Sequence, residues 1–274
     1  MSELSFTSPS FGRRLKGMLG VDFYRLFHTP MYYIFLGIAA VIPAMILGTA
    51  GMENPQTGEV TARLYHNVWH IIAAEKPVYV VSDIAQYANM NMVFIFGGIM
   101  VSVFIGHDYR SGYVKQLFTT HPRKIDYMLS KSITCAFAMA CMCLTYLVGA
   151  VLAGALTGVS FAVDPVGLLS ALLGKIVLSL GWASLYTFLN IIFRRYFGIS
   201  IVSSFFFGTG ILSIGAAAVV GNSAGLNLLL YGASVYACLS GSLLTVAVCA
   251  GVSLLWMLVY NLLGTWVLSK CDVY

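Results

Sequence analysis

The sequence predicts an all-α membrane protein with six transmembrane helices in a single domain covering residues 1–274. Three observations lead to this prediction. The chain is 59% hydrophobic and 9% charged, which leaves too little polar surface to cover a water-soluble globule. Six apolar runs approach the roughly 20 residues that a helix needs to cross a bilayer. The Lys and Arg residues collect in alternate gaps between these runs, as in multi-pass membrane proteins.

Residues 1–30 form a polar, basic N-terminal segment. Its apolar residues recur at helical spacing, and its cations lie around the other face; the apolar set is Phe11, Leu15, Met18 and Leu19. This pattern is typical of an amphipathic helix in the membrane interface, and we expect such a helix over residues 11–27. A basic tail without a helix is the alternative, because the topological effect of the charge does not require a helix.

The six expected spans follow in order. They cover residues 31–48, 90–106, 132–158, 166–193, 199–220 and 243–268. Asp164 is placed to cap the fourth span, and Pro165 suits its first turn. Lys175 falls inside that span, where a cation at mid-bilayer costs roughly 3 kcal/mol. We therefore expect its ammonium group to snorkel outward or to face the interior of the bundle.

The 15 Lys and Arg residues divide 12 to 3 between the two sets of gaps. The poorer set contains Arg63, Lys76 and Lys175. The positive-inside rule therefore places both termini in the cytoplasm. Residues 51–89 then form a long extracellular loop.

The uncharged segment 221–241 is rich in Gly, Asn, Ser and Ala. Non-helical backbone at membrane depth needs protein or water to satisfy its polar groups. We expect a pair of short re-entrant or interfacial helices here. A seventh span is the alternative, and it would move the C-terminus to the outside.

His66 and His70 lie one helical turn apart in the extracellular loop, which is a spacing that metal-binding helices use. Residue 67 is Asn where a zinc protease has its general-base Glu, and the nearest candidates for a third ligand are Glu59 and Glu75. Zinc sites need three or more protein ligands. We therefore predict no metal site, and a membrane-embedded metalloenzyme is the least favoured function.

Segment 107–131 connects the second span to the third. Tyr109, Tyr113, Leu117 and Phe118 share one helical face, opposite Arg110 and Lys115. Pro122 then ends the helix. A short amphipathic helix joined to two spans can seat in a groove on a cytoplasmic partner and convert that partner's movement into a rearrangement of the spans. An ordinary interfacial loop is the alternative.

This segment resembles the corresponding region of ABC-2-type permeases, the membrane subunits of ATP-binding cassette transporters, and in particular those for bacitracin and lantibiotic resistance. The resemblance rests on Asp108, on Gly112 followed by Lys115, and on Arg123 and Ser130-Lys131 in that order. It implies an exporter of the bacterial cytoplasmic membrane with a coupling helix over residues 108–118. The residues that it implies for coupling to the ATPase are Asp108, Tyr109, Arg110, Gly112, Tyr113, Lys115, Leu117 and Phe118.

No G-x-x-x-x-G-K-S/T sequence occurs in the chain, so we do not expect it to bind ATP through a P-loop or to be an enzyme. The resemblance places ATP and Mg²⁺ on a separate cytoplasmic ATPase subunit. A half with six spans pairs with a second permease, either a copy or a homologue, to enclose a pathway. The expected partners are these subunits and membrane lipid, with no nucleic acid.

The spans lack the strings of Asp, Glu or His that mark proton relays. We therefore expect an apolar or weakly polar pathway for an antimicrobial peptide, a drug or a lipid-like compound. An ion-coupled secondary transporter or a channel is the alternative. The candidate lining residues, which can instead form hydrogen bonds between helices, are Tyr186, Asn190, Ser203, Ser204, Tyr260 and Asn261.

Overall fold

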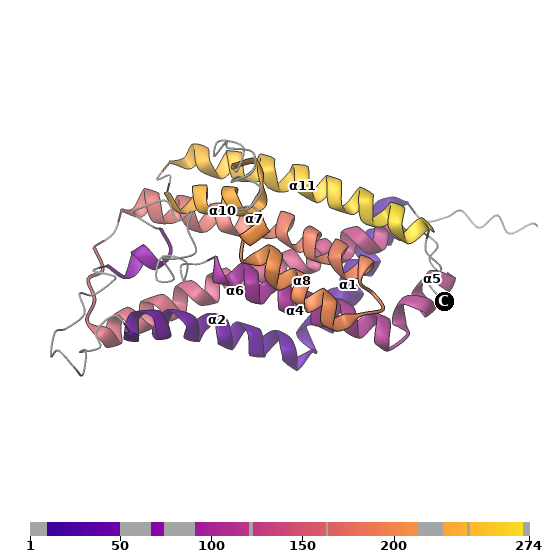
Figure 1. Cartoon of the computed structure of the whole chain (residues 1–274), viewed down its shortest axis with the longest axis horizontal. Coiled ribbons are helices and arrows are strands. Elements are labelled where there is room, and N and C mark those ends of the chain that lie inside the picture. The colour runs from indigo at the N-terminus through magenta and orange to yellow at the C-terminus, as the bar shows by residue number, and fades with distance from the viewer. Residues whose placement is uncertain are drawn as a thin grey trace, which may run out of the picture.

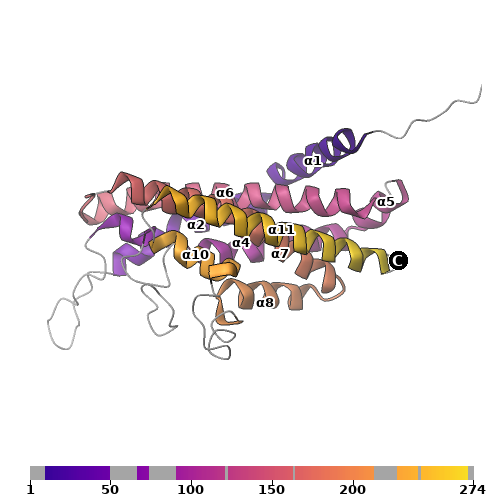
Figure 2. The same ribbon diagram turned by 90° about the horizontal axis from the view of Figure 1, so that it is seen from above.

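The computed structural model describes residues 10–49, 67–73, 91–120, 123–162, 164–212, 227–239 and 242–270, and these are built almost entirely of helices. The long helices lie side by side as a bundle (Figure 1), and α1 leans away from it at one end (Figure 2). The helices in chain order are α1 (Phe11–Phe27), α2 (Pro30–Thr49), the 3-10 helix η1 (Val68–Ile71), α4 (Met92–Arg110), α5 (Tyr113–Thr120), α6 (Lys124–Thr157), α7 (Pro165–Ile192), α8 (Phe197–Gly208), α10 (Leu230–Leu239) and α11 (Leu243–Lys270).

Five of these helices, α2, α4, α6, α7 and α11, are long and apolar enough to cross a bilayer. They match five of the six predicted spans, so the chain is a multi-pass membrane protein. The remaining span was predicted over residues 199–220. There α8 has 12 residues, too few to cross a hydrocarbon core of about 30 Å, and residues 213–220 lie outside the described part. The structure thus confirms five spans and leaves the sixth as a prediction.

Helix α6 lies at the centre of the packing, with α2 along one side and α7 along another, while α11 packs on α7. The approach of α6 to α2 is close because residue 149 is Gly: a Cβ atom there would overlap the backbone carbonyl of Ala40. Small residues allow such approaches between helices in a membrane, where apolar burial does not drive helix association. The main core consequently runs through the length of the bundle.

The start of α7 is as predicted. The Asp164 side chain accepts a hydrogen bond from the Val166 backbone N–H at 3.2 Å, and Pro165 occupies the first turn. The start of α6 differs from the prediction, because the helix begins at Lys124 instead of residue 132. Its first two turns carry charged and hydroxyl side chains, and these hid the helix from a search for apolar runs.

The single helix expected over residues 108–118 is divided in two. The backbone of Gly112 has φ +72°, a left-handed conformation that Gly adopts without steric cost. The N–H groups of Ser111 and Gly112 bond to the carbonyls of His107 and Tyr109, which ends α4. Asp108 therefore belongs to the last turn of α4, and α5 begins at Tyr113.

Segment 221–241 was expected to form two short helices. Residues 227–239 are described and contain one ten-residue helix, α10, which packs on α7 and α11. The second expected helix has no counterpart in that part. Residues 221–226 and 240–241, like His66 and most of the loop 51–89, lie outside the described residues.

The ends of α4 and α11, the α7–α8 loop, α1, α5 and the beginning of α6 lie at one end of the bundle, which we call the charged end (Figure 1). These segments carry twelve cations, which are Arg13, Arg14, Lys16, Arg25, Arg110, Lys115, Arg123, Lys124, Lys131, Arg194, Arg195 and Lys270. Lys175 lies in the half of α7 away from this end, and Arg63 and Lys76 lie outside the described residues. The uneven distribution of charge in the sequence is therefore also an uneven distribution in space.

Candidate functional site

Four ionised side chains from three helices meet inside the charged end, and we call them the charge cluster. They are Asp22 and Arg25 of α1, Asp108 of α4 and Lys131 of α6. Lys131 Nζ lies 2.6 Å from Asp22 Oδ1 and 2.6 Å from Asp108 Oδ2. Arg25 Nη2 donates to Asp108 Oδ1. Two carboxylates and two cations leave the cluster electrically neutral.

The periodicity of α1 explains how a carboxylate enters this site. Met18, Asp22 and Leu26 are spaced four residues apart, and all three are buried on the face that packs against α6. A buried carboxylate is costly unless it is paired and hydrogen-bonded. Here Lys131 supplies the opposite charge, and Ser130 Oγ donates to Asp22 Oδ2 at 2.6 Å.

The helix predicted over residues 11–27 is therefore present with those bounds, but the buried stripe differs from the expected one. The expected stripe was Phe11, Leu15, Met18 and Leu19. Phe11 is exposed, and Met18 is the member that belongs to the buried stripe. The sequence pattern correctly indicated an amphipathic helix and missed that its inner face carries Asp22.

Aromatic rings complete the surroundings of the two cations. The Arg25 guanidinium lies 4.1 Å from the centre of the Tyr113 ring, and Lys131 Nζ lies 4.6 Å from that of Phe104. Such contacts favour a cation that has lost part of its water shell. Burial opposes the charge on Arg25, but the attraction of Asp108 outweighs it, and the pKa of Arg25 is raised. Burial also raises the pKa of the Tyr113 phenol, which stays protonated.

A second ion pair lies nearer the beginning of α1. Arg14 Nε donates to Asp126 Oδ2 at 2.9 Å, and both side chains are almost fully buried. A small apolar core lies beside it and brings together α1, α5, α6 and the ends of α7 and α11; its members are Met18, Val114, Tyr127, Met128, Ile191 and Leu268. Helix α5 thus joins a core shared with four other helices, and Phe118 of α5 packs edge-on against Tyr127 of α6.

The structure divides the eight residues that sequence similarity implied for coupling to an ATPase. Asp108 is completely buried in the charge cluster. Tyr109, Tyr113, Leu117 and Phe118 are half-buried, the last two against the small core. Gly112 forms the turn between α4 and α5. Arg110 and Lys115 are exposed, and Lys115 shares the outer face of α5 with Gln116 and Thr119.

The residues suggested as a pathway lining lie where helices meet, in the half of the bundle formed by α4, α7, α8 and α11. The Tyr186 hydroxyl donates to the carbonyl of Phe94 at 2.9 Å. Asn190 Nδ2 donates to Ser102 Oγ at 3.1 Å, and Ser102 Oγ lies 2.9 Å from Ser204 Oγ. These groups are buried, and they connect α7 and α8 to α4.

A similar arrangement holds α11. Asn261 Oδ1 accepts from Ser132 Oγ at 3.1 Å, and Asn261 Nδ2 donates to Ser184 Oγ at 3.3 Å. Tyr260 stacks between Trp256 and Phe188. Ser203 makes a local bond to the carbonyl of Ser200. In this conformation the side chains of Tyr186, Asn190, Ser204 and Asn261 connect helices to one another, whereas Ser203 bonds within its own helix.

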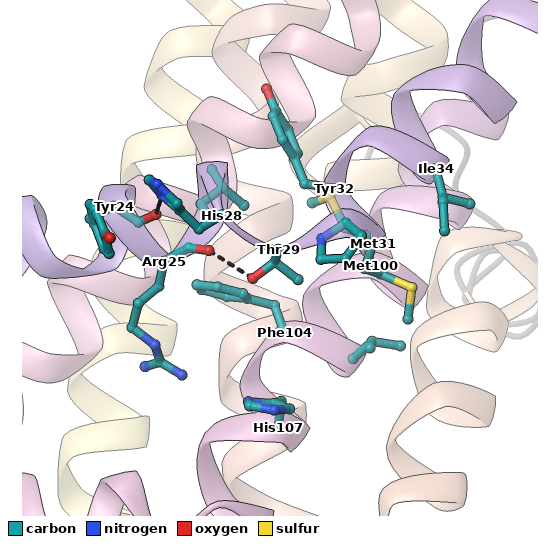
Figure 3. Close-up of a pocket in the computed structure, with 13 residues that line it drawn as sticks. Tyr24, Arg25, His28, Thr29, Met31, Tyr32, Ile34, Met100, Phe104 and His107 are labelled. Atoms are coloured by element: carbon teal, nitrogen blue, oxygen red, sulfur yellow. Dashed lines mark hydrogen bonds between the residues drawn. The ribbon is translucent and has the colours of Figure 1, made fainter.

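A pocket of about 590 Å³ lies between the α1–α2 elbow and α4. Figure 3 shows Arg25, His28 and His107 at its polar end and Met31, Ile34 and Met100 farther along α2 and α4. Its size is that of a pocket for a small organic molecule. Because the basic groups lie toward the charged end and the apolar groups lie deeper, the pocket suits an amphipathic molecule aligned with the bundle. Arg25 and Phe104 belong both to this pocket and to the surroundings of the charge cluster.

In the part of the chain that the structure describes, no three His, Cys, Asp or Glu side chains converge as a metal site would require. His70 lies in η1, and His66 lies outside that part. The described residues therefore give the metalloenzyme alternative no support.

Sequence reasoning missed Asp22, Arg25 and Lys131 as the partners of Asp108, and it missed the separate pair of Arg14 with Asp126. One signal was present. Asp22 has the same helical phase as Met18 and Leu26, so a carboxylate stood on the apolar side of an otherwise basic helix. An acidic residue in that position indicates a buried cation on a neighbouring helix.

No protein-family model matches the chain, and no curated protein matches its sequence. Function is therefore inferred from the geometry of the chain itself.

Proposed function

We propose that the chain is the permease subunit of an ATP-binding cassette exporter in the bacterial cytoplasmic membrane. A separate ATPase subunit would supply the energy, and a second permease would complete the pathway. The observation that carries the proposal is the attachment of α5. This short helix lies between two long apolar helices, and buried packing and ion pairs connect it and its neighbours to α1.

The orientation follows from charge. Twelve of the 15 Lys and Arg residues belong to the charged end, and the positive-inside rule places that end in the cytoplasm. Helix α1 then lies near the inner membrane interface, and the outer face of α5 meets the cytosol. A soluble subunit can reach Lys115 and Gln116 there.

Movement of α5 would pass to the spans along two routes. The first is the short turn at Gly112, which leads to Asp108 and through it to Lys131 and Arg25. The second is the small core around Val114 and Tyr127. Packed and ion-paired contacts transmit displacement because they do not deform continuously. Asp108 therefore acts as an internal link instead of a contact with the ATPase.

The pocket in Figure 3 supports an amphipathic or hydrophobic cargo. Its apolar part lies at the depth of the second span, and its basic part lies at the charged end. A compound dissolved in the inner leaflet would present its polar group to Arg25 and its apolar body to Met100. This arrangement fits a drug, a lipid-like compound or an amphipathic peptide.

The test is reconstitution of the tagged chain, purified together with the ATPase that accompanies it, in liposomes. We expect ATP-dependent transport that falls at least tenfold in Lys115→Glu, because the reversed charge faces the ATPase. Lys16→Glu is the matched control, since it reverses an exposed cation at the same end on α1, and it should retain activity. Transport by the chain alone, independent of nucleotide, would overturn the proposal.

An ion-coupled carrier is the second candidate, because Lys175 is completely buried inside the bundle. Its ammonium group donates to Asn91 Oδ1 at 2.5 Å. Ionisable groups inside a membrane domain often mark ion pathways. Transport that follows a proton or sodium gradient without nucleotide, and that is lost in Lys175→Met, would favour this candidate.

A further inference from the structure

A second, smaller pocket lies at the charged end, between the end of α4 and the loop that joins α7 to α8. Its volume is about 90 Å³. Three arginines contribute to its lining, and no carboxylate does. The lining residues are Gly106, Tyr109, Arg110, Asn190, Phe193, Arg194, Arg195, Phe197 and Ser200. We call it the arginine pocket.

The positive charge of this pocket is not balanced within the described part of the chain. Arg14 and Arg25 each pair with a carboxylate, whereas no ion pair to Arg194 or Arg195 is found among the described residues. Arg194 Nη1 is buried there without a hydrogen-bond partner. Arg110 packs over the Phe197 ring at 4.2 Å. A guanidinium nitrogen that is buried in this way is costly unless an acceptor takes its hydrogen bond.

The start of α8 adds further donors. The N-cap residue Tyr196 makes no capping hydrogen bond through its side chain, and the first turn carries no acidic residue. The first N–H groups of a helix lack partners within the helix and carry partial positive charge. A Cβ atom at Gly198 would meet nothing within 4 Å, so the backbone is open on that side. Helix starts of this kind bind phosphate groups.

We propose that the arginine pocket binds the phosphate of an anionic membrane lipid. Guanidinium groups match the geometry of phosphate oxygens and form paired hydrogen bonds with them. The volume suits a headgroup phosphate and not a whole ligand. The bound lipid would tie the loop after α7 to the end of α4.

The surface of α8 identifies the source of the phosphate as a lipid. Ile199, Val202 and Phe206 are exposed and lie along one face of α8, which begins at the pocket. Acyl chains attached to a phosphate in the pocket would lie along this face. A free anion would leave it uncovered. The inference requires a membrane protein and does not depend on the proposed export function.

The experiment uses the full chain in detergent with added dioleoylphosphatidylglycerol or, at the same mole fraction, dioleoylphosphatidylcholine. Native mass spectrometry measures how much of each lipid stays bound, and thermal unfolding measures stabilisation. We expect phosphatidylglycerol to bind at least tenfold more tightly. We expect this preference to fall at least fivefold in Arg194→Gln and in Arg195→Gln. Arg123→Gln is the control, because it removes an exposed cation at the same end outside the pocket.

Three outcomes would overturn the proposal. The first is an unchanged preference in both variants. The second is an equal loss in Arg123→Gln, which would reduce the effect to general surface charge. The third is competition by millimolar inorganic phosphate that displaces the lipid and gives the same stabilisation, which would make the site one for a free anion. Arg195 is exposed, so its variant keeps the test valid if Arg194→Gln does not fold.

Discussion

Two buried lysines of the chain differ in their surroundings. One belongs to the charge cluster, which connects helices to one another, and the other is hydrogen-bonded to a neutral group. Lys131, at the charged end, is paired with Asp22 and Asp108 and lies against aromatic rings. Lys175, in the other half of the bundle, donates to the neutral Asn91 and lies 5.9 Å from the centre of the Phe94 ring. Both are completely buried. Their environments differ in charge, although their exposure is the same.

The difference predicts how each site responds to substitution. Removal of Lys131 leaves two carboxylates buried together, and an uncompensated buried charge is strongly destabilising. Removal of Lys175 takes one hydrogen-bond donor from the neutral amide of Asn91, which costs much less. The charge cluster therefore holds helices in place, whereas Lys175 contributes much less to stability.

The largest effect is expected for Lys131→Met. We predict a loss of about 3 to 5 kcal/mol in the free energy of unfolding, because Asp22 and Asp108 lose their shared cation. Unfolding in mixed micelles by increasing denaturing detergent measures it. Lys115→Met, at an exposed position, is the control and should change stability by less than about 0.5 kcal/mol. Equal losses in the two variants would show that the charge cluster stabilises the protein no more than an exposed lysine does.

A smaller effect is expected for Asp126→Asn, which breaks the ion pair with Arg14 beside the charge cluster. Arg14, whose side chain is almost fully buried, would lose its carboxylate and keep a neutral amide oxygen in its place. We predict a loss of about 2 kcal/mol, as for a hydrogen bond to a charged group. The double variant Arg14→Met with Asp126→Asn should recover part of the loss. Additive losses in this cycle, measured by the same titration, would show that the two residues do not interact.

For Lys175→Met we predict a loss of about 1 kcal/mol, because the methionine side chain fills most of the same space and the Asn91 oxygen loses only one donor. Combining it with Asn91→Leu should bring the change closer to zero. The free energies of unfolding of the single and double variants show whether the loss comes from the missing hydrogen bond to Asn91. A loss as large as that of Lys131→Met would mean that Lys175 is also paired with a buried opposite charge.

The smallest effect is expected at the Gly112 turn, which lies beside the charge cluster. Gly112→Ala should cost about 1 kcal/mol, because φ +72° is unfavourable for a residue with a Cβ atom although the site has room for one. Gly17→Ala, in an exposed turn of α1, should stabilise by up to about 1 kcal/mol, because Ala favours the helix. Thermal unfolding should therefore show a loss of stability in Gly112→Ala and a gain in Gly17→Ala. A change of the same sign in both variants would contradict the left-handed turn at Gly112.

The sequence predicted what depends on local composition. The bounds of α1, α2, α7 and α11 lie within two residues of those expected, because the apolar runs and the Asp164-Pro165 cap are visible in the chain. The division of α4 from α5 was not predicted. Helical spacing continues across residues 108–118, and only the conformation of Gly112 interrupts it.

The charge cluster was beyond reach for another reason. Asp22 lies 109 residues from Lys131 along the chain, and Arg25 lies 83 residues from Asp108. Apart from the helical phase of Asp22, each residue alone has the appearance of an ordinary member of a basic segment. The sequence indicates the net charge of that end, whereas pairing requires the helix packing that brings α1, α4 and α6 together.

The length of α6 has a mechanical consequence. Its 34 residues give a rod of about 50 Å at 1.5 Å per residue, against a hydrocarbon thickness of about 30 Å. The excess includes the two turns that carry Asp126 and Lys131. A rod fixed in the membrane and gripped at its protruding end works as a lever, so a small sideways push there tilts the whole rod. Its far end, where Gly154 packs against Val68, would swing in the opposite direction.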